Sequence, residues 1–367
     1  MRHNDPDRDT GVRPLNIDLL RRLTDAPGVA GFEDHVRDVV AAELKSLVDK
    51  LLVDRLGNLI ARKQGTAGSA GPTILLVAHM DEIGFLVRFV DERGFVRLQP
   101  LGSFDPRVLL AQRVEVHAQN GQRFVGVVAT TVEPHHFTPP REARIPQVSD
   151  LFVDLSGHGT AFRDHVEIGD MVTLERSLYV AGDHIVSKAL DDRLGLYVMI
   201  EALRQLGDHR ATIIAVASAQ EEVGSRGAVA AGYVVDPDIC IALDLTLAND
   251  FPGMNPEEEV TRLGCGPAIK IMDTTQISHR GVVRHLRDLA HQHDIPVQLE
   301  VLNQGGTDAS LVQRIRAGVA VVTLSLPARY IHTVNEMAHI GDVERGVTLL
   351  ARYLEAAHER YLTTAME

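Results

Sequence analysis

The sequence is poor in cysteine. Only Cys240 and Cys265 occur among 367 residues, and neither belongs to a CxxC pair. Cys240 lies within the apolar run DICIALDL. We therefore expect two buried free thiols rather than a disulfide or a thiolate metal site, and this expectation fits a reducing cytoplasm.

Long apolar segments are also missing. No stretch approaches the roughly 18 uninterrupted apolar residues that a membrane-spanning helix requires. The first residues, MRHNDPDRDTGVRP, contain no apolar segment after their first charges, so they predict neither a signal peptide nor a membrane anchor. Residues 1–14 are expected to form a disordered tail, and no membrane partner is expected.

Basic residues are fewer than acidic ones. The chain has 37 Lys and Arg against 50 Asp and Glu, which gives a formal net charge of -13. Nonspecific nucleic-acid binding depends on neutralising phosphates with Lys and Arg, so this charge argues against a nucleic-acid partner. The hydrophobic fraction of 45% is that of an ordinary globular protein, and the length allows more than one domain.

The first part and the last half of the chain alternate between apolar runs and amphipathic segments. This pattern predicts an α/β domain with a largely parallel sheet. Helices are expected to cover the sheet where apolar residues recur at three- and four-residue spacing. The expected strands are 73–79, 211–218, 238–245, 296–302 and 319–326, and the expected helices lie near 33–48, 190–206, 278–292 and 341–361.

The middle of the chain follows a different pattern. Short alternating runs such as GFVRLQPL and RFVGVVATT are separated by Gly, Pro and Asp, without a long helical segment. This indicates a small β-rich domain over residues 85–179, inserted into a discontinuous α/β domain formed by residues 15–84 and 180–367. The turn-rich segment 133–144 is expected to be an exposed loop of the inserted domain.

A first candidate for chemistry is the segment ILLVAHMDE, which places His79 and Asp81 two residues apart. In an extended chain both side chains project from one face. A metal-binding imidazole usually donates its other N–H to a carboxylate or a carbonyl, and Asp81 could supply that partner. The alternative is a core histidine that is satisfied by a neighbour.

A second candidate is SKALDDRLGLYVMIEAL, in which Asp191 and Asp192 open a strongly apolar helix. Acids in a first helical turn are favoured by capping and by the helix dipole, so capping alone could explain both. The functional interpretation is that one of the two carboxylates bridges two cations.

Further polar residues follow apolar strands. AQEEVGSRG supplies Glu221 and Glu222, IALDLTLAND supplies Asp244, and SLPARYIHTVNEM supplies His332. Open α/β sheets keep their binding crevice at the carboxyl ends of parallel strands. Each residue alone could be a solvated strand end, but together they predict one site.

These residue types favour a particular chemistry. Histidine and carboxylate ligands without cysteine suit Zn, Co or Mn in a hydrolytic site rather than a structural zinc. Two divalent ions carry four positive charges, and Asp191, Glu222 and Asp244 would supply three negative ones. A bridging hydroxide would balance the remaining charge, and a carboxylate outside the metal shell would be needed to accept the proton of the water.

The order of motifs resembles one known family. AHMDE, ALDDR, QEEVGSRGA, ALDLTLANDFPG and IHTVNE occur as in the tetrahedral aminopeptidase family of dinuclear metallopeptidases, which also includes glutamyl- and leucyl-type aminopeptidases and proteins labelled deblocking aminopeptidase or endoglucanase M. The resemblance extends from about residue 15 to about residue 360 and includes LGCGPAI and GGTDAS.

The resemblance implies roles for matching positions. One metal would be held by His79 and Asp244, the other by Glu222 and His332, and Asp191 would bridge the two. Asp81 would orient His79, and Glu221 would act as general base and acid. The implied cofactors are two divalent ions per subunit, with Zn or Co preferred over Mn.

The resemblance also implies an architecture. The fold would be a three-layer α/β/α phosphorylase/hydrolase-like domain with an inserted PDZ-like dimerisation domain, and the subunits would form dimers and a tetrahedral dodecamer. The chain departs from the family at Asp192, where relatives often carry Asn, and at Thr333 and Val334, where relatives show a small residue and proline. None of these positions is a predicted ligand.

The expected function is therefore hydrolysis of N-terminal residues from peptides through a metal-bridging water. Two alternatives stay open. One is a cellulase or endoglucanase-type glycoside hydrolase, which needs a pair of carboxylates and no metal cluster. The other is a non-catalytic assembly protein on the same fold.

Overall fold

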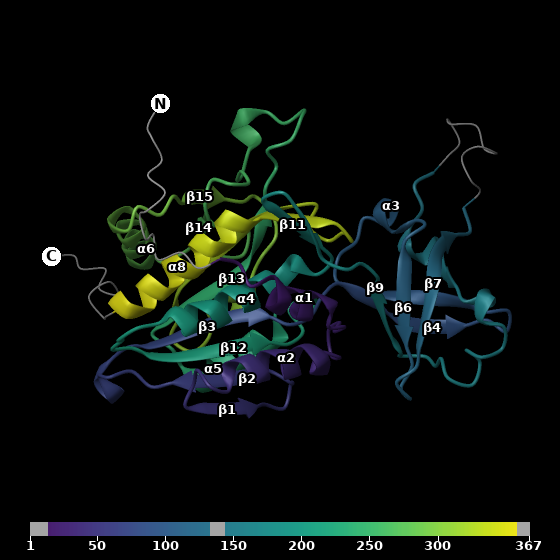
Figure 1. The fold of residues 1–367 in the computed structure, drawn as a ribbon, viewed down its shortest axis with the longest axis horizontal. Helices are drawn as coiled ribbons and strands as arrows, with labels where there is room; N and C mark the ends of the chain where they lie inside the picture. Colours follow the sequence, from purple (N-terminus) through teal and green to yellow (C-terminus); the bar gives the residue numbers. More distant parts are fainter. Residues whose placement is uncertain (1–13, 133–143, 358–367) are drawn as a thin grey trace.

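The computed structural model describes residues 14–132 and 144–357. The predicted tail, apart from its last residue, and the predicted loop at 133–144, apart from Arg144, lie outside these ranges. The chain forms a mixed α/β fold with an eleven-stranded sheet and a separate closed β-barrel (Figure 1). The predicted combination of an α/β domain and a small β-rich insertion is confirmed.

The large sheet has a parallel centre and antiparallel flanks. Its order is β1-β2-β12-β3-β13-β16-β17-β11-β10, and β14 pairs with both β16 and β15. The strands are β1 (Lys50–Val53), β2 (Leu59–Lys63), β3 (Thr73–His79), β10 (Tyr179–Ala181), β11 (His184–Ser187), β12 (Thr212–Ser218), β13 (Ile239–Leu247), β14 (Ala268–Met272), β15 (Gln298–Val301), β16 (Ala320–Arg329) and β17 (Glu336–His339).

The prediction of a largely parallel sheet is correct only for the centre. Strands β12, β3, β13 and β16 are parallel neighbours, and β15 is parallel to β14. The pairs β1–β2, β2–β12, β14–β16, β16–β17, β17–β11 and β11–β10 are all antiparallel. The central strands are continuous apolar runs, as is usual for strands covered on both faces, whereas the outermost strands β1 and β10 are short and mostly exposed.

Helices cover both faces of the sheet and produce the three predicted layers. On β3, Ile74 and Leu76 belong to one apolar cluster, whereas Leu75 and Val77 belong to another. The first cluster includes residues of α1 (Ile17–Asp25), α2 (Asp34–Leu44), α4 (Leu190–Gln205), α6 (Arg280–Gln292) and α8 (Ile340–Ala356). The second includes residues of α5 (Arg226–Val235) and α7 (Asp308–Val312). No helix within the described ranges is long and apolar enough to cross a membrane.

The inserted segment folds into a barrel beside the sheet (Figure 1). Six antiparallel strands close in the order β4-β5-β8-β7-β6-β9, and β9 pairs back onto β4. A third apolar cluster fills this barrel. Its elements are β4 (Gly84–Val90), β5 (Phe95–Leu101), α3 (Pro106–Leu109), β6 (Arg113–His117), β7 (Arg123–Thr130), β8 (Leu151–Asp154) and β9 (Met171–Leu174).

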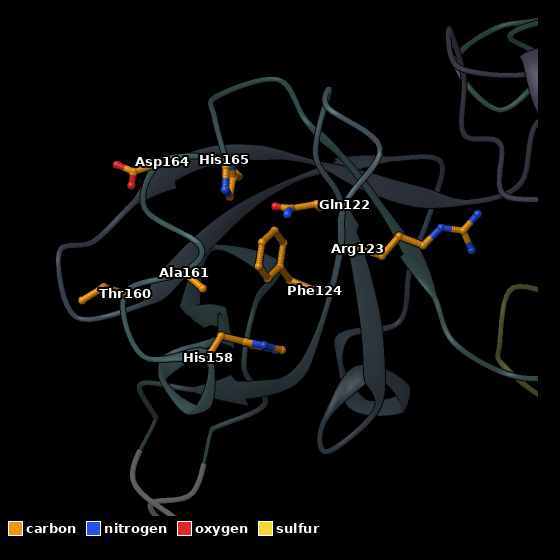
Figure 2. Close-up of a pocket in the computed structure, with 8 residues that line it drawn as sticks. All are labelled: Gln122, Arg123, Phe124, His158, Thr160, Ala161, Asp164 and His165. Carbon is orange, nitrogen blue, oxygen red and sulfur yellow. The ribbon is translucent and has the colours of Figure 1, made fainter.

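The barrel has a small cavity of its own, of about 380 Å³. Figure 2 shows Phe124 between two histidines, and its ring centroid lies 5.4 Å from that of His158 and 6.4 Å from that of His165. Asp164 is the only carboxylate among the residues that line the cavity. Neither group of potential metal ligands found among the described residues includes a residue of this cavity, so the chemistry predicted from the sequence belongs elsewhere.

One sequence prediction is wrong in the fold. Cys240 is a buried free thiol as expected, but the free thiol Cys265 is exposed. Cys265 lies in the turn before β14, between Gly264 and Gly266, both of which have positive φ. A turn of this kind runs over the surface, and the single letter C in LGCGPAI does not reveal its burial.

A buried ion pair ties the end of β3 to the start of α4. The ammonium of Lys188 donates to Glu82 Oε1 at 2.9 Å, to Glu82 Oε2 at 2.8 Å and to the Thr24 carbonyl at 2.8 Å. Arg193 lies 3.6 Å from the same carboxylate and is itself fully buried. Because Glu82 follows Asp81 and Lys188 precedes Asp191, this pair sets the spacing of two segments that carry predicted site residues.

We expect Lys188→Met to lower the free energy of unfolding by about 3 kcal/mol, because it removes the two shorter contacts of the buried Glu82 carboxylate and leaves only Arg193, at 3.6 Å. The free energy of unfolding is measured by urea titration. Glu82→Gln alone and the double variant complete a mutant cycle, and the double loss should be clearly smaller than the sum of the single losses. Additive losses of unfolding free energy would show that Lys188 and Glu82 do not stabilise the protein through their mutual interaction.

Candidate metal and catalytic site

The five predicted ligands and Glu221 line one cavity of about 390 Å³. His79 is the last residue of β3, and Glu221 and Glu222 follow the end of β12 by three and four residues. Because β3 and β12 are parallel neighbours, their carboxyl ends meet at one edge of the sheet. The cavity therefore lies where open α/β sheets place their ligands. The rest of its wall is uncharged: Gly224, Ser225, Thr275, Gly305, Gly306, Thr307, Ser310 and Leu311.

Asp191 is at the centre of the cluster. Its Oδ1 lies 3.2 Å from His79 Nε2, and its Oδ2 lies 3.3 Å from His332 Nε2. The backbone at Asp191 and Asp192 is not helical, with ψ of 108° and 40°, although both residues fall within the bounds of α4. The carboxylate thus faces a different histidine with each of its two oxygens.

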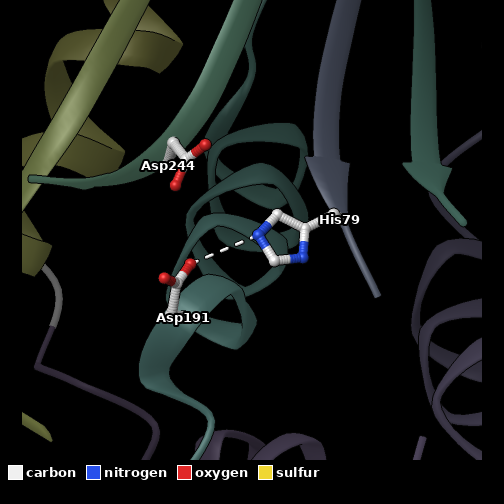
Figure 3. A group of neighbouring side chains, drawn as sticks. All are labelled: His79, Asp191 and Asp244. Atoms are coloured by element: carbon white, nitrogen blue, oxygen red, sulfur yellow. Dashed lines mark hydrogen bonds and ion pairs between the residues drawn. The ribbon is translucent and has the colours of Figure 1, made fainter. Parts of the chain in front are cut away.

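Two groups of potential ligands share Asp191. His79, Asp191 and Asp244 form the first, and Figure 3 shows the imidazole of His79 facing both carboxylates. Asp191, Glu222 and His332 form the second, and His332 Nε2 lies 3.4 Å from Glu222 Oε1. Within each group the candidate ligand atoms lie within 4.8 Å of one another. The geometry brings together every predicted ligand, while the roles assigned to the individual residues stay predictions.

Asp244 differs slightly from its expected position. It was expected at the end of its strand, but β13 continues to Leu247 and pairs with β16 over its whole length. The side chain is mostly buried, and its Oδ1 accepts a hydrogen bond from the Leu245 N–H at 2.7 Å. Asp244 therefore reaches the cluster from within the strand, where it is in register with Ser325 of β16, whereas the pairing of β13 with β3 ends at Ala242.

Both histidines have one ring nitrogen occupied by a backbone carbonyl. The Nδ1 of His79 lies 2.8 Å from the Asp81 carbonyl, and the Nδ1 of His332 lies 2.9 Å from the Ser103 carbonyl. A carbonyl only accepts, so in each neutral ring Nδ1 carries the proton and Nε2 keeps its lone pair. Both lone pairs then point toward Asp191, which is the tautomer that metal ligation through Nε2 needs.

Asp81 contributes through two different groups. Its carbonyl contacts His79, whereas its carboxylate oxygen Oδ1 is farther from His79 Nδ1, at 3.6 Å. The carboxylate instead accepts the N–H of Glu221 at 3.0 Å and the N–H of Glu222 at 3.1 Å. The orientation of the imidazole by Asp81 stays a prediction, and the structure shows that the Asp81 carboxylate holds the turn bearing both glutamates.

Glu336 is a buried acid that the sequence reasoning missed. It accepts the N–H of Asp191 at 3.0 Å through Oε2 and the N–H of His332 at 2.8 Å through Oε1. One side chain thereby fixes the backbone of two candidate ligands that are far apart in sequence. The only signal in the sequence was an acid four residues after His332. Asp192 acts similarly, since its Oδ2 accepts the His79 N–H at 3.2 Å.

The loop that carries His332 is held by the inserted barrel. Ser103, whose carbonyl faces His332, follows β5, and Phe104 stacks on Phe85 of the barrel at 4.5 Å between ring centroids. Val334 belongs to the apolar cluster of the barrel. His332 itself has a φ of 63°, a conformation that a non-glycine residue adopts only when its surroundings support it. The barrel thus supplies part of the support for this side chain.

Burial dominates the electrostatics of the cluster. It raises the pKa of Glu221 and of Asp244 well above their usual values, and the negative charge of Asp191 adds to the shift of Asp244. Burial also acts to raise the pKa of Asp191, but hydrogen bonds from His332 and His79, which form when both rings are protonated and Nε2 carries a hydrogen, outweigh it and hold that pKa below its usual value. Buried carboxylates in such numbers resist ionisation unless positive charge is placed among them.

The residues fit divalent cations. Glu222 Oε1 is buried and makes no hydrogen bond, which leaves an acceptor aimed into the cluster without a donor. The donor set of two imidazoles and three carboxylates suits Zn, Co or Mn, and it excludes the soft all-thiolate environment of a structural zinc. The cations would supply the positive charge that the buried carboxylates lack.

Comparison with known proteins gives one consistent result. The family model described as M42 glutamyl aminopeptidase matches residues 57–349. The chain is 36% identical to the lysyl aminopeptidase of Pyrococcus furiosus over 354 residues, which cover 93% of this chain and 97% of the relative.

Solved structures agree with the sequence comparison. An aminopeptidase from the archaeon Desulfurococcus kamchatkensis is similar to this chain with a TM-score of 0.90 and 36% identity, over 96% of this chain and 97% of the other. A TET peptidase of Pyrococcus horikoshii, described as able to assemble into a tetrahedron or a large octahedral shell, is similar with a TM-score of 0.81 and 29% identity, over 93% and 99%.

Gly102 provides a test of the link between the barrel and the second group of ligands. Its φ is +86°, and a Cβ added there would lie 2.6 Å from Ile83 Cγ2 and 3.0 Å from Glu222 Oε2. We expect Gly102→Ala to weaken divalent-cation binding at the group containing Glu222 and His332 by about 10-fold, because displaced supporting groups misplace ligands. Calorimetric titration of metal-free protein with Co²⁺ measures this affinity.

Gly121 is the matched control. It lies in the same barrel with a φ of +85°, and nothing lies within 4 Å of an added Cβ. Gly121→Ala should therefore carry the same backbone strain, and a similar loss of stability, without any change in cation affinity. Equal cation affinities for the two alanine variants would show that the position of Gly102 against Glu222 does not matter.

Proposed function

The chain belongs to the M42 glutamyl aminopeptidase family and is a peptide hydrolase, and we propose that it removes N-terminal residues from peptides with the help of two divalent metal ions. The observation that carries this proposal is the convergence of five candidate ligands and Glu221 on one cavity. A glycosidase would need two carboxylates flanking a sugar and no histidines among them, so the two imidazoles favour the peptidase.

We assign the ligands by the two geometric groups. His79 and Asp244 would hold one ion, Glu222 and His332 would hold the other, and Asp191 would contact both, since each of its oxygens faces a different histidine. Zn or Co is the preferred ion, and Mn is the third choice. When bound, such ions would polarise the scissile carbonyl and lower the pKa of a water molecule.

Glu221 is the proposed general base and acid. It lines the cavity but belongs to neither group of potential ligands, so its carboxylate is left for proton transfer. It would accept a proton from the attacking water and deliver it to the leaving amine nitrogen. Asp81 would support this role, because its carboxylate holds the backbone N–H of Glu221 and therefore the position of the side chain.

The two-part fold has a proposed division of labour. Residues 15–84 and 180–367 would form the catalytic domain, and residues 85–179, which include the barrel, would form a dimerisation domain. The chain would self-associate into dimers and a dodecamer. Self-association is supported by the similarity to the Pyrococcus horikoshii TET peptidase, which is described as able to assemble into a tetrahedron or a large octahedral shell. The cytoplasmic location and the absence of nucleic-acid and membrane partners stay predictions from the sequence.

Glu221→Gln is expected to lower kcat for an aminoacyl-anilide by a factor of about 10² to 10⁴, which is the usual contribution of general acid–base catalysis. Gln has nearly the same shape but cannot exchange the proton. The cation content, measured by mass spectrometry, and the circular dichroism spectrum should equal those of the wild type. A variant that keeps its metal and most of its activity would refute the role of Glu221.

Removal of metal tests the cofactor requirement directly. Dialysis against a chelator should abolish hydrolysis of aminoacyl-anilides, and Zn²⁺, Co²⁺ or Mn²⁺ should restore it, because the ligand set of the cavity suits all three. A panel of different aminoacyl groups reports the preferred N-terminal residue in the same experiment. Hydrolysis of a chromogenic cellulose fragment that survives full chelation would instead support the glycosidase alternative.

A further inference from the structure

The carboxylate of Glu221 has one side-chain partner of particular interest. The hydroxyl of Ser225 donates to Glu221 Oε1 at a distance of 2.9 Å. Ser225 is almost fully buried and lines the same cavity. The Ser225 hydroxyl therefore contacts the proposed base directly. The motif QEEVGSRG shows that a serine is present but does not indicate this contact.

The backbone does not explain a serine at this position. Ser225 is the residue before α5 and has a φ of +48°, a region that favours glycine or asparagine. Serine is common before a helix because its hydroxyl caps the first turn, but the Ser225 side chain makes no capping hydrogen bond. The hydroxyl is turned instead toward Glu221, so the contact with the carboxylate is the interaction that distinguishes serine here.

The nearby acid Asp308 competes for this hydroxyl. Burial raises the pKa of Asp308 to about 6, and hydrogen bonds with Ser218, at 2.5 Å from Oδ2, and with Ser225 act against this rise. A serine hydroxyl has a single proton to donate, and its well-formed hydrogen bond is the one to Glu221 Oε1, at 2.9 Å. The geometry therefore favours Glu221 over Asp308 as the acceptor.

We propose that Ser225 is a positioning residue for Glu221, which fixes one carboxylate oxygen so that the other exchanges the proton. The Ser225 hydroxyl keeps its own proton throughout and holds Oε1. The proton of the attacking water passes to Oε2 and then to the leaving amine nitrogen. This inference rests on the proposed function, because it assumes that Glu221 is the base.

The test compares Ser225→Gly with Ser225→Ala. Both variants lack the hydroxyl, but glycine suits the positive φ and alanine does not. Loss of a hydrogen bond to a charged group should lower kcat for an aminoacyl-anilide by about 10-fold in both variants, with KM changed by less than about two-fold. Cation content should equal that of the wild type. If the backbone were decisive, Ser225→Gly would be as active as the wild type.

Asp236 gives a matched control in the same helix. It is the residue after α5, has a φ of +51°, and lies at the opposite end of that helix from the cavity. Asp236→Gly should leave kcat and KM unchanged. A loss of kcat in Asp236→Gly equal to that in Ser225→Gly would assign the effect to the helix rather than to the hydroxyl and would overturn the proposal.

A mutant cycle with Glu221 separates positioning from a general structural effect. In Glu221→Gln protein, Ser225→Gly should cause no further loss of kcat, because the group that the hydroxyl positions no longer transfers a proton. The same loss in both backgrounds would refute the proposal. Failure of the proposed function shows separately, as an absence of chelator-sensitive aminopeptidase activity in the wild type.

Discussion

The site depends on one carboxylate placed between two imidazoles. Asp191 can face His79 with one oxygen and His332 with the other because each ring donates its Nδ1 proton to a backbone carbonyl and turns its Nε2 inward. The other acids surround this arrangement from separate elements. Their burial raises the pKa of several of them, so positive charge placed within the cluster would stabilise their ionised forms.

The support around this centre comes largely from backbone groups and from buried acids outside the ligand set. Glu336 accepts the N–H groups of Asp191 and His332, and Asp81 accepts those of Glu221 and Glu222. Each of these acids therefore fixes two functional residues at once. A carboxylate with two backbone donors is held in a single orientation, and the residues that it holds are preorganised in turn.

The inserted barrel is separate from the large sheet, but it also supports the candidate site. The loop after β5 places the Ser103 carbonyl against His332. Gly102 in the same loop has no Cβ, so Glu222 can lie close to it. Val334 extends into the apolar cluster of the barrel. Val334 is buried there, which gives a packing reason for an apolar residue at this position. The position of one candidate ligand thus depends on contacts made by both parts of the fold.

Much of this arrangement could be predicted from the sequence, and the reasons differ from element to element. Strands β3, β12 and β13 were predicted well because strands buried on both faces are continuous apolar runs. Helix α5 was missed because its 10 residues, RGAVAAGYVV, carry small and apolar residues without an amphipathic pattern. The antiparallel flanks were missed because the short strands β1 and β10 show no alternation of apolar and polar residues.

The sequence by itself determined which side chains could do chemistry, since acids and histidines after buried strands are expensive to bury without a purpose and stand out against apolar neighbours. Only the tertiary structure decided which of their atoms meet. The carbonyl of Ser103 has no signature in a sequence, because every residue carries the same group, and it lies 229 residues from His332. The direction of the Ser225 hydroxyl was likewise set by the turn that ends β12, since a serine before a helix could equally have capped it.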